Sequence, residues 1–324
     1  MLTYILIPIL AFLSYIIYRY FYPTPNIDTN GKYVLISGCD TGFGNALALE
    51  LDKKGFNVLA GIYDLKNQAT LTERLSSRAT VFKLDITNQQ DIDDAFELIS
   101  SKTKVLHALV NNAGIGACGY VDWITVDSIR KVMDVNFYGH VSMTKKFLPL
   151  LIAKRDSRVV NICSVAGYLA APGMAAYSTS KYALEAFSDC LRREMGQWNL
   201  RVSIIEPGFM KTAIVEGHDI GLRNIWNSMS TDVQQRWGEE HLNQQIALLS
   251  NPLIKYAENP RKVVKALTHA VMNSVPQIRY RPGWQSGVLL FGLSCAPAWF
   301  ADIMVKLTNT AAISPAGVRN QLQD

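Results

Sequence analysis

The chain has 324 residues, of which 49% are hydrophobic and only 18% charged, with a net charge of +5. This length suits one large α/β domain or two small ones. The net charge is small, and the sequence has no dense run of lysine and arginine. Nothing therefore supports nucleic-acid binding. The five cysteines are widely spaced without a C-x-x-C pair, and the five histidines lack metal-ligand spacing. We therefore predict neither a disulfide framework nor a metal site.

The N-terminal segment is apolar. Leu2–Tyr18 carries no charge and is followed by Arg19 and three aromatic residues. A helix of this length spans roughly 26 Å, near the lower limit for crossing a bilayer. Because a basic start and a small-residue cleavage site are both missing, the segment favours an uncleaved membrane anchor over residues 1–22, with a cleaved signal as the alternative. Residues 23–30, which contain two prolines, form a short polar linker.

Apolar runs alternate with helical patterns from residue 31 to 280. We predict strands at Tyr33–Ser37, Asn57–Ile62, Thr80–Leu84, Ala108–Val110, Arg158–Cys163 and Arg201–Glu206. Helix-length segments lie between them at Asn45–Lys54, Asp91–Lys102, Ser128–Leu151 and Tyr177–Trp198. Strands that alternate with helices indicate parallel pairing and right-handed crossovers. The predicted fold class is therefore α/β, a doubly wound parallel sheet of Rossmann type.

The pattern becomes irregular after the sixth strand, from about residue 209 to 258. Among polar residues it contains Met210, Ile214, Trp226, Met229 and Trp237. A long insertion after the carboxyl end of a strand is where a helical substrate lid would lie, and a peripheral helical subdomain is a compatible interpretation.

The last segment, residues 281–324, contains a second uncharged run, Trp284–Phe300. Its glycines and Pro297 argue against a spanning helix. We expect an interfacial segment or part of a hydrophobic substrate mouth, with simple core packing as the alternative.

The first strand leads directly into the turn Ser37-Gly-Cys-Asp-Thr-Gly-Phe-Gly44 and then a helix. Glycines at 38, 42 and 44 would let the backbone approach a pyrophosphate, whose charge a helix N-terminus favours. Asp85 ends the third strand, where its carboxylate could accept a hydrogen bond from an adenine amino group. Asn111-Asn-Ala-Gly114 ends the fourth strand and Ser164 the fifth. The carboxyl ends of parallel strands converge on one crevice, so these residues predict a dinucleotide site.

Tyr177 and Lys181 are one helical turn apart and share a face. A free phenol has a pKa of about 10, too high for a base at neutral pH. A neighbouring ammonium, together with an oxidised nicotinamide, would favour the phenolate. The pair alone occurs by chance in many proteins, so its meaning depends on the other motifs.

The motifs "SGCDTGFG", "NNAG", "VNICS", "YSTSK" and "EPG", in this order and spacing, resemble the short-chain dehydrogenase/reductase family over residues 31–280. The resemblance implies a catalytic tetrad of Asn136, Ser164, Tyr177 and Lys181. Ser164 would hold the substrate oxygen, Asn136 would position a water that links Lys181 to solvent, and Lys181 would bond the ribose hydroxyls. Thr212 would bond the nicotinamide amide. One mild departure is Cys163, where the family often has a second serine.

The cofactor is predicted to be NAD rather than NADP. Asp64, after the second strand, could meet the ribose hydroxyls and repel a 2′-phosphate. No arginine lies there, although Lys66 is close and Asp64 stands two places beyond the family's usual acidic position. The full set of predicted cofactor contacts is Gly38, Asp40, Thr41, Gly42, Phe43, Gly44, Asp64, Asp85, Ile86, Asn112, Ala113, Gly114, Tyr177, Lys181, Pro207, Gly208 and Thr212.

Within the family, "SGCDTGFG", "EAFSDCLRREM" and "IRYRPGW" are most similar to the membrane-associated branch of retinol and hydroxysteroid dehydrogenases. This implies NAD-dependent interconversion of a lipophilic alcohol and its carbonyl. The alternatives are a 3-hydroxybutyrate dehydrogenase, which belongs to the same branch, and a dinucleotide-binding scaffold or redox sensor. Arg19 and Lys32 follow the apolar run, so the positive-inside rule places the catalytic domain in the cytosol, at the endoplasmic reticulum. The mitochondrial inner membrane is the alternative location, and a homodimer is compatible with the sequence.

Overall fold

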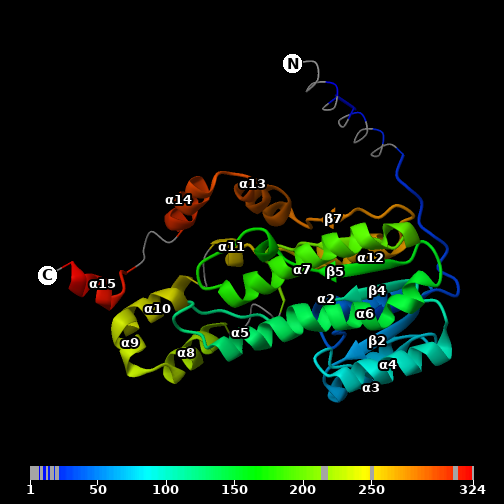
Figure 1. Ribbon diagram of the computed structural model, residues 1–324, viewed down its shortest axis with the longest axis horizontal. Coiled ribbons are helices and arrows are strands. Elements are labelled where there is room, and N and C mark those ends of the chain that lie inside the picture. The colour runs from blue at the N-terminus through cyan, green and yellow to red at the C-terminus, as the bar shows by residue number, and fades with distance from the viewer. Residues whose placement is uncertain are drawn as a thin grey trace.

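A computed structural model of the chain describes residues 7, 10, 11, 14, 18, 22–212, 218–248, 252–308 and 313–322. Seven parallel strands form one sheet in the order β3-β2-β1-β4-β5-β6-β7 (Figure 1). Their bounds are β1 Tyr33–Ile36, β2 Asn57–Ile62, β3 Thr80–Lys83, β4 Ala108–Asn111, β5 Arg158–Ile162, β6 Arg201–Ile205 and β7 Arg279–Tyr280. The doubly wound sheet predicted from the sequence is confirmed, and each predicted strand agrees to within a residue at either end. The two-residue β7 was not predicted, because so short a strand shows no alternation.

Helices cover both faces of the sheet. On one face α2 (Gly42–Lys53) packs on β2 and α12 (Arg261–Met272) on β5 and β6. On the other face α4 (Gln89–Lys102) packs on β3, α6 (Gly139–Ile152) on β4 and β5, and α7 (Ala175–Glu194) on β6. Strand side chains alternate between these two cores: Val34 and Ile36 enter the first and Leu35 the second. The short α3 (Gln68–Arg74) follows β2 at the sheet's edge.

The helix predicted at Ser128–Leu151 is divided in two. The structure has α5 (Val126–Met133), a π-helical segment (Asp134–Tyr138) and then α6. Such single-turn π segments are frequent at functional sites, and this one carries Asn136. Periodicity does not reveal the interruption, because the side-chain contacts that define it come from another part of the chain.

The segment that follows β6 begins and ends at neighbouring positions, which are joined by backbone hydrogen bonds. Lys211 N donates to Glu258 O at 3.0 Å and Glu258 N to Phe209 O at 2.8 Å. Between them lie α8 (His218–Ser228), α9 (Thr231–Trp237), α10 (Glu239–Leu248) and α11 (Pro252–Lys255). We call the described residues of 209–258 the lid.

The lid has an aromatic core of its own. Trp226 packs with Leu222, Leu242 and Trp123, and Met229 and Trp237 pack against this cluster. Met210 does not belong to it; its side chain is buried in the main core under α12. Ile214 lies outside the described residues.

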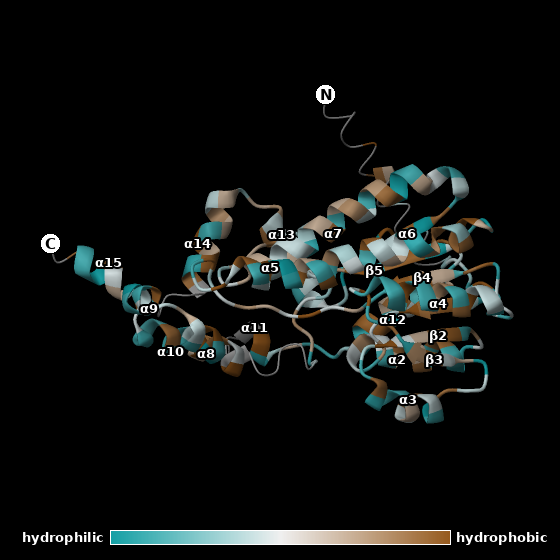
Figure 2. Ribbon diagram, turned by 60° about the horizontal axis from the view of Figure 1, so that its bottom comes forward, coloured by the Kyte–Doolittle hydropathy of each residue, from teal (hydrophilic) through white to brown (hydrophobic). Residues whose placement is uncertain are grey.

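The C-terminal segment comprises a π-helical turn (Gln285–Leu289), α13 (Leu290–Ser294), α14 (Ala298–Thr308) and α15 (Ala316–Gln321). On α14 the apolar side chains Trp299, Phe300 and Leu307 are exposed, and Figure 2 shows this helix apart from the sheet. In contrast, α15 returns to the lid, where Arg319 pairs with Glu240 at 2.7 Å.

The N-terminal linker is fixed to the domain. Asn26 forms an antiparallel bridge with Asn273, and Ile27 N donates to Met272 O at 2.9 Å. Most of Leu2–Tyr18 lies outside the described residues, so the anchor stays a prediction. Among the residues that are described, no helix has both the length and the apolar character needed to span a membrane.

Candidate active site

The turn after β1 has no room for side chains at two of its glycines. Gly38 has a positive φ of +69°, and a Cβ there would lie 2.8 Å from the Cα of Ala113. At Gly44, in the first turn of α2, a Cβ would lie 2.3 Å from the carbonyl oxygen of Gly38. Only glycine permits both approaches. The N-terminus of α2 therefore lies directly against the ends of β1 and β4.

Side chains of two motifs lock this turn in place. The Ser37 hydroxyl accepts hydrogen bonds from the backbone N–H groups of Asn112 and Ala113, both at 3.1 Å. The Asn112 amide in turn donates to the carbonyl oxygens of Ser37 and Gly38, both at 2.9 Å. The "NNAG" motif thus acts mainly as a clamp on the glycine turn, and only its edge faces the groove.

A cavity of about 680 Å³ runs along the carboxyl ends of the strands. Most of the predicted cofactor contacts line it: Gly38, Asp40, Thr41, Gly42, Phe43, Asp85, Ile86, Asn112, Ala113, Gly114 and Thr212. Its volume, its glycine-rich floor and the N-terminus of α2 fit a dinucleotide.

Several wall residues were not predicted. Tyr63 follows β2, and Asp127, Arg130, Lys131, Asp134 and Val135 come from α5 and the π-helical segment. The sequence holds no signal for them, because only the packing of α5 decides which of its faces meets the groove.

Six predicted contacts do not line this cavity, and two of them, Tyr177 and Lys181, belong to the tetrad described below. Gly44 acts through backbone packing, as described above. Asp64 is exposed, and its carboxylate accepts from Lys66 N at 3.0 Å, capping a short 3₁₀ turn. Pro207 accepts from Val165 N at 2.9 Å, and Gly208 packs against Gln285. The hydrogen bond at Pro207 joins the ends of β5 and β6, and Gly208 lies beside it.

Asp40 occupies the place expected for Asp64. It lines the cavity, and its carboxylate accepts from the backbone N–H groups of Tyr63 and Asp64, each at 2.8 Å, and from the Asn67 amide at 3.1 Å. These bonds hold the loop after β2 against the glycine turn. They also fix a carboxylate at the wall of the cavity.

The four tetrad residues are brought together from three elements. Tyr177 and Lys181 lie on α7, with the Lys181 Nζ 5.7 Å from the centre of the Tyr177 ring. Ser164, at the end of β5, lies beside the Tyr177 hydroxyl and acts to lower its pKa. Asn136 and Lys181 meet across Gly114, where a Cβ would lie 3.3 Å from Asn136 Oδ1 and 3.9 Å from Lys181 Nζ. Gly114 also lines the cavity, so the tetrad adjoins it.

Asn136 is fully buried and binds backbone. Its Oδ1 accepts from Ile115 N at 2.9 Å, and its Nδ2 donates to Ile115 O at 3.0 Å and to Ser180 Oγ at 3.2 Å. The amide thereby holds the segment after β4 to α7. Asn136 makes these hydrogen bonds from the π-helical segment that divides α5 from α6.

Burial dominates the electrostatics of the pair on α7. It raises the pKa of Tyr177 to about 12, although the neighbouring Ser164 opposes this. Burial also lowers the pKa of Lys181, whose Nζ donates to Ile162 O at 2.9 Å. Without a bound cofactor the protein therefore keeps the phenol protonated. That Lys181 and an oxidised nicotinamide together favour the phenolate stays a prediction.

The histidines whose side chains are described have structural contacts. Burial lowers the pKa of His107 and of His140 to about 3, so both rings are neutral. Their Nε2 atoms contact the carbonyl oxygens of Val271 and Ala113. Among the described residues no group of His, Cys, Asp and Glu could hold a metal ion.

Comparison with known proteins agrees with this arrangement. The family model for short chain dehydrogenase matches residues 32–220. Retinol dehydrogenase 5 of Mus musculus is 38% identical over 86% of this chain and 89% of that protein. The 17-beta-hydroxysteroid dehydrogenase type 6 of Bos taurus is 35% identical over 85% and 87%, respectively.

Solved structures share the fold. A short-chain dehydrogenase/reductase from Burkholderia phymatum, in complex with NAD, has a TM-score of 0.70 at 19% identity, covering 86% of this chain and 96% of that one. At this identity the likeness concerns the fold alone. The family model and the sequence relatives support the assignment, and the four tetrad residues adjoin a cavity that fits a dinucleotide. The chain is an oxidoreductase of the short-chain dehydrogenase/reductase family.

Proposed function

We propose that this protein is an NAD-linked dehydrogenase that interconverts a lipophilic alcohol, a retinol or a hydroxysteroid, and its carbonyl. The observation that carries the proposal is the contact of Ser164 with Tyr177 beside the cavity, in a chain whose relatives are named as retinol and hydroxysteroid dehydrogenases. A scaffold without turnover would have no need of all four tetrad residues.

Tyr177 is the acid/base in this proposal. When bound, NAD supplies the hydride acceptor and a positive nicotinamide ring. Tyr177 accepts the alcohol proton, and Ser164 holds the substrate oxygen against the phenol. Lys181 and the bound ring must together offset the burial that holds the Tyr177 pKa near 12. Asn136 keeps α7 in register with the segment after β4.

The preference for NAD rests on Asp40 rather than Asp64. Because the Asp40 carboxylate is fixed at the cavity wall beside the loop after β2, it would repel a 2′-phosphate. We expect kcat/KM with NAD to exceed that with NADP by about 100-fold, and Asp40→Ala to narrow the ratio by about tenfold. Asp64→Ala is the matched control and should leave the ratio unchanged. An unaltered ratio in Asp40→Ala would contradict this assignment.

The proposed substrate is lipophilic and the proposed location a membrane. Support comes from the apolar N-terminal run and from the exposed Trp299, Phe300 and Leu307 of α14. We place the protein at the endoplasmic reticulum with its catalytic domain in the cytosol. Protease protection of residues 31–324 in intact microsomes would contradict that topology, and removal of a transit peptide would point to mitochondria.

A short hydroxy acid is not favoured. It would require a free cation in the lid to bind its carboxylate. Arg236 is paired with Asp122 at 3.4 Å and with Asp232 at 3.2 Å, and the relatives named above carry retinol or steroid names. The 3-hydroxybutyrate alternative therefore has no observation behind it.

One panel tests the proposal. Purified protein in detergent is given all-trans-retinol, 3- and 17-hydroxysteroids or 3-hydroxybutyrate, each with NAD and with NADP, and nicotinamide reduction is followed by absorbance. We expect turnover of at least one lipophilic alcohol. Turnover of 3-hydroxybutyrate alone would refute the lipophilic substrate and leave the tetrad intact.

A further inference from the structure

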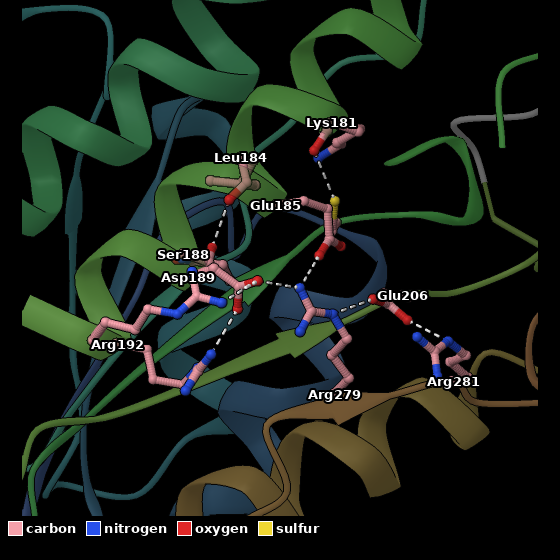
Figure 3. Close-up of polar contacts among 12 residues, drawn as sticks. Lys181, Leu184, Glu185, Ser188, Asp189, Arg192, Glu206, Arg279 and Arg281 are labelled. Carbon is pink, nitrogen blue, oxygen red and sulfur yellow. Dashed lines mark hydrogen bonds and ion pairs between the residues drawn. The ribbon is translucent and has the colours of Figure 1, made fainter. Parts of the chain in front are cut away.

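A partly buried group of charged side chains lies between α7, the catalytic helix that carries Tyr177 and Lys181, and the strands β6 and β7 (Figure 3). Arg279, on β7, is at its centre. Its guanidinium contacts Glu185 Oε2 on α7 at 3.1 Å and Glu206 Oε1 at the end of β6 at 3.1 Å. Two carboxylates from different elements therefore share one cation.

Each carboxylate adjoins a part of the proposed site. Glu185 lies one turn after Lys181 on α7. Glu206 is only 1% exposed and directly precedes Pro207-Gly208. The Pro207 carbonyl oxygen accepts a hydrogen bond from the N–H of Val165, the residue after Ser164. The shared Arg279 thus joins the helix that carries Tyr177 and Lys181 to the turn that precedes Thr212.

Cys163 links the group to the tetrad more directly. Its Sγ donates to the carbonyl oxygen of Lys181 at 3.2 Å. Burial and the nearby Glu185 raise the pKa of the Cys163 thiol, so it remains a neutral donor. A Cβ on Gly167 would lie 2.7 Å from that Sγ and 3.1 Å from Glu185 Cγ, which shows how closely these elements pack.

Glu185 and Glu206 lie close enough together to repel each other when both are ionised. Glu185 Oε1 is buried without a hydrogen-bond partner. Burial and the mutual repulsion with Glu185 raise the pKa of Glu206 to about 7, and burial raises that of Glu185. The charged or titratable neighbours from all packed elements are Cys163, Tyr168, Lys181, Asp189, Arg279 and Arg281.

We propose that Glu185 and Glu206 are positioning residues which, through Arg279, hold the catalytic helix against the Pro207-Gly208 turn and make cofactor binding depend on pH. The ionised Glu206 makes two charge-assisted contacts, to Arg279 and, at 2.7 Å, to Arg281. Protonation weakens both contacts and loosens the turn locally. It also removes the larger cost of burying the carboxylate, so the fold as a whole gains stability. The inference rests on the proposed dinucleotide site.

The experiment compares the wild type with Glu206→Gln, a permanently neutral variant of nearly the same shape. NADH affinity is measured by fluorescence between pH 6 and pH 8. We expect wild-type affinity to rise about three- to tenfold over this range as Glu206 ionises, because the ionised form fixes the turn. The Glu206→Gln affinity should stay near the wild-type value at pH 6 throughout.

Asp189→Asn is the matched control. Asp189 also contacts Arg279, at 3.0 Å, but it lies a turn farther from Lys181 on α7 and is less buried. It should retain the wild-type slope. A wild-type slope in Glu206→Gln, or a lost slope in Asp189→Asn, would overturn the proposal.

Thermal unfolding supplies a readout that does not involve the cofactor. The folded-state pKa of Glu206, about 7, lies above its unfolded value, so its protonation stabilises the fold at low pH and this stabilisation is lost as pH rises toward 7. The Tm of Glu206→Gln should therefore rise relative to that of the wild type as the pH increases from 5 to 7.5. A pH-independent difference in Tm would refute the titration.

The two readouts separate the possible failures. If no variant binds NADH, the proposed function fails while the Tm series still tests the carboxyl pair. If the Tm series behaves as expected and the wild-type NADH affinity has no slope, the pair titrates without positioning the site, and the inference is wrong. Should Glu206→Gln fail to fold, Glu185→Gln replaces it, because relief of the repulsion should move the step to lower pH.

Discussion

The cofactor half of the molecule and the lid are held together by different forces. Around Gly38 and Gly44 the backbone itself is the contact surface, with approaches that leave no space for a Cβ, and the Asn112 amide fixes the turn through short hydrogen bonds. The lid joins the domain at residues 209 and 258 and through an aromatic cluster with Trp123. The glycine turn is thus placed by directional contacts, whereas the lid is placed largely by apolar packing, which tolerates changes of shape. The lid's polar contacts with Asp122, from Arg236 and Trp237, lie at the edge of that cluster.

The difference predicts that catalysis, substrate binding and cofactor binding can be damaged separately. The largest effect should come from the tetrad. Tyr177→Phe removes only the titrating oxygen, so turnover should fall about 10³-fold or more, while NADH affinity stays within about twofold. Steady-state rates and NADH fluorescence titration measure the two. Near-normal turnover in this variant would refute the mechanism.

An intermediate effect is expected in the lid. Trp226→Ala removes a nearly buried ring that packs edge-on against Trp123 with centroids 5.8 Å apart. Loss of a buried tryptophan costs about 3–5 kcal/mol locally, so kcat/KM for the lipophilic alcohol should fall about tenfold or more, with NADH affinity unchanged.

Trp198→Ala, in the 3₁₀ turn that follows α7, replaces an exposed ring. It is the matched control for the lid and should behave as wild type. If Trp226→Ala weakened NADH binding as strongly as it weakened kcat/KM, the two halves would not be independent. The comparison drawn above would then be mistaken.

The smallest effect is expected from the glycine turn. Gly44→Ala places a Cβ against the carbonyl oxygen of Gly38, and the backbone must shift. Overpacking of this kind costs about 1–3 kcal/mol, so NADH affinity should fall about tenfold. Gly196→Ala, where the added Cβ meets open space, is the control. Equal NADH affinities in the two variants would show that the turn is not part of the cofactor site.

Much of the candidate site was readable in the sequence because its parts are local. A strand followed by a glycine turn and a helix, and a tyrosine one turn before a lysine, are patterns set by backbone periodicity. The parallel sheet then follows from the alternation of strands and helices. Since carboxyl ends of parallel strands meet at one edge, the gathering of Ser164, Gly114 and Gly38 could also be predicted.

Other features were decided only by the tertiary structure. Asp40 rather than Asp64 lines the cavity, because the Asp40 carboxylate is held there by N–H groups of a loop more than twenty residues away. Met210 enters the main core rather than the lid, although it belongs to the same irregular stretch as Trp226. The two-residue β7 exists because Arg279 and Tyr280 pair with an already formed β6.

The sequence by itself thus determined the order of strands and helices and the glycine turn, because each depends on residues close together in the chain, and it predicted the tetrad from the order and spacing of its motifs. Only the tertiary structure decided the charges behind α7, the wall that α5 gives to the cavity and the pKa of Tyr177. All three depend on burial and on neighbours from distant segments of the chain. Contacts of about 3 Å between such groups cannot be predicted from the local sequence.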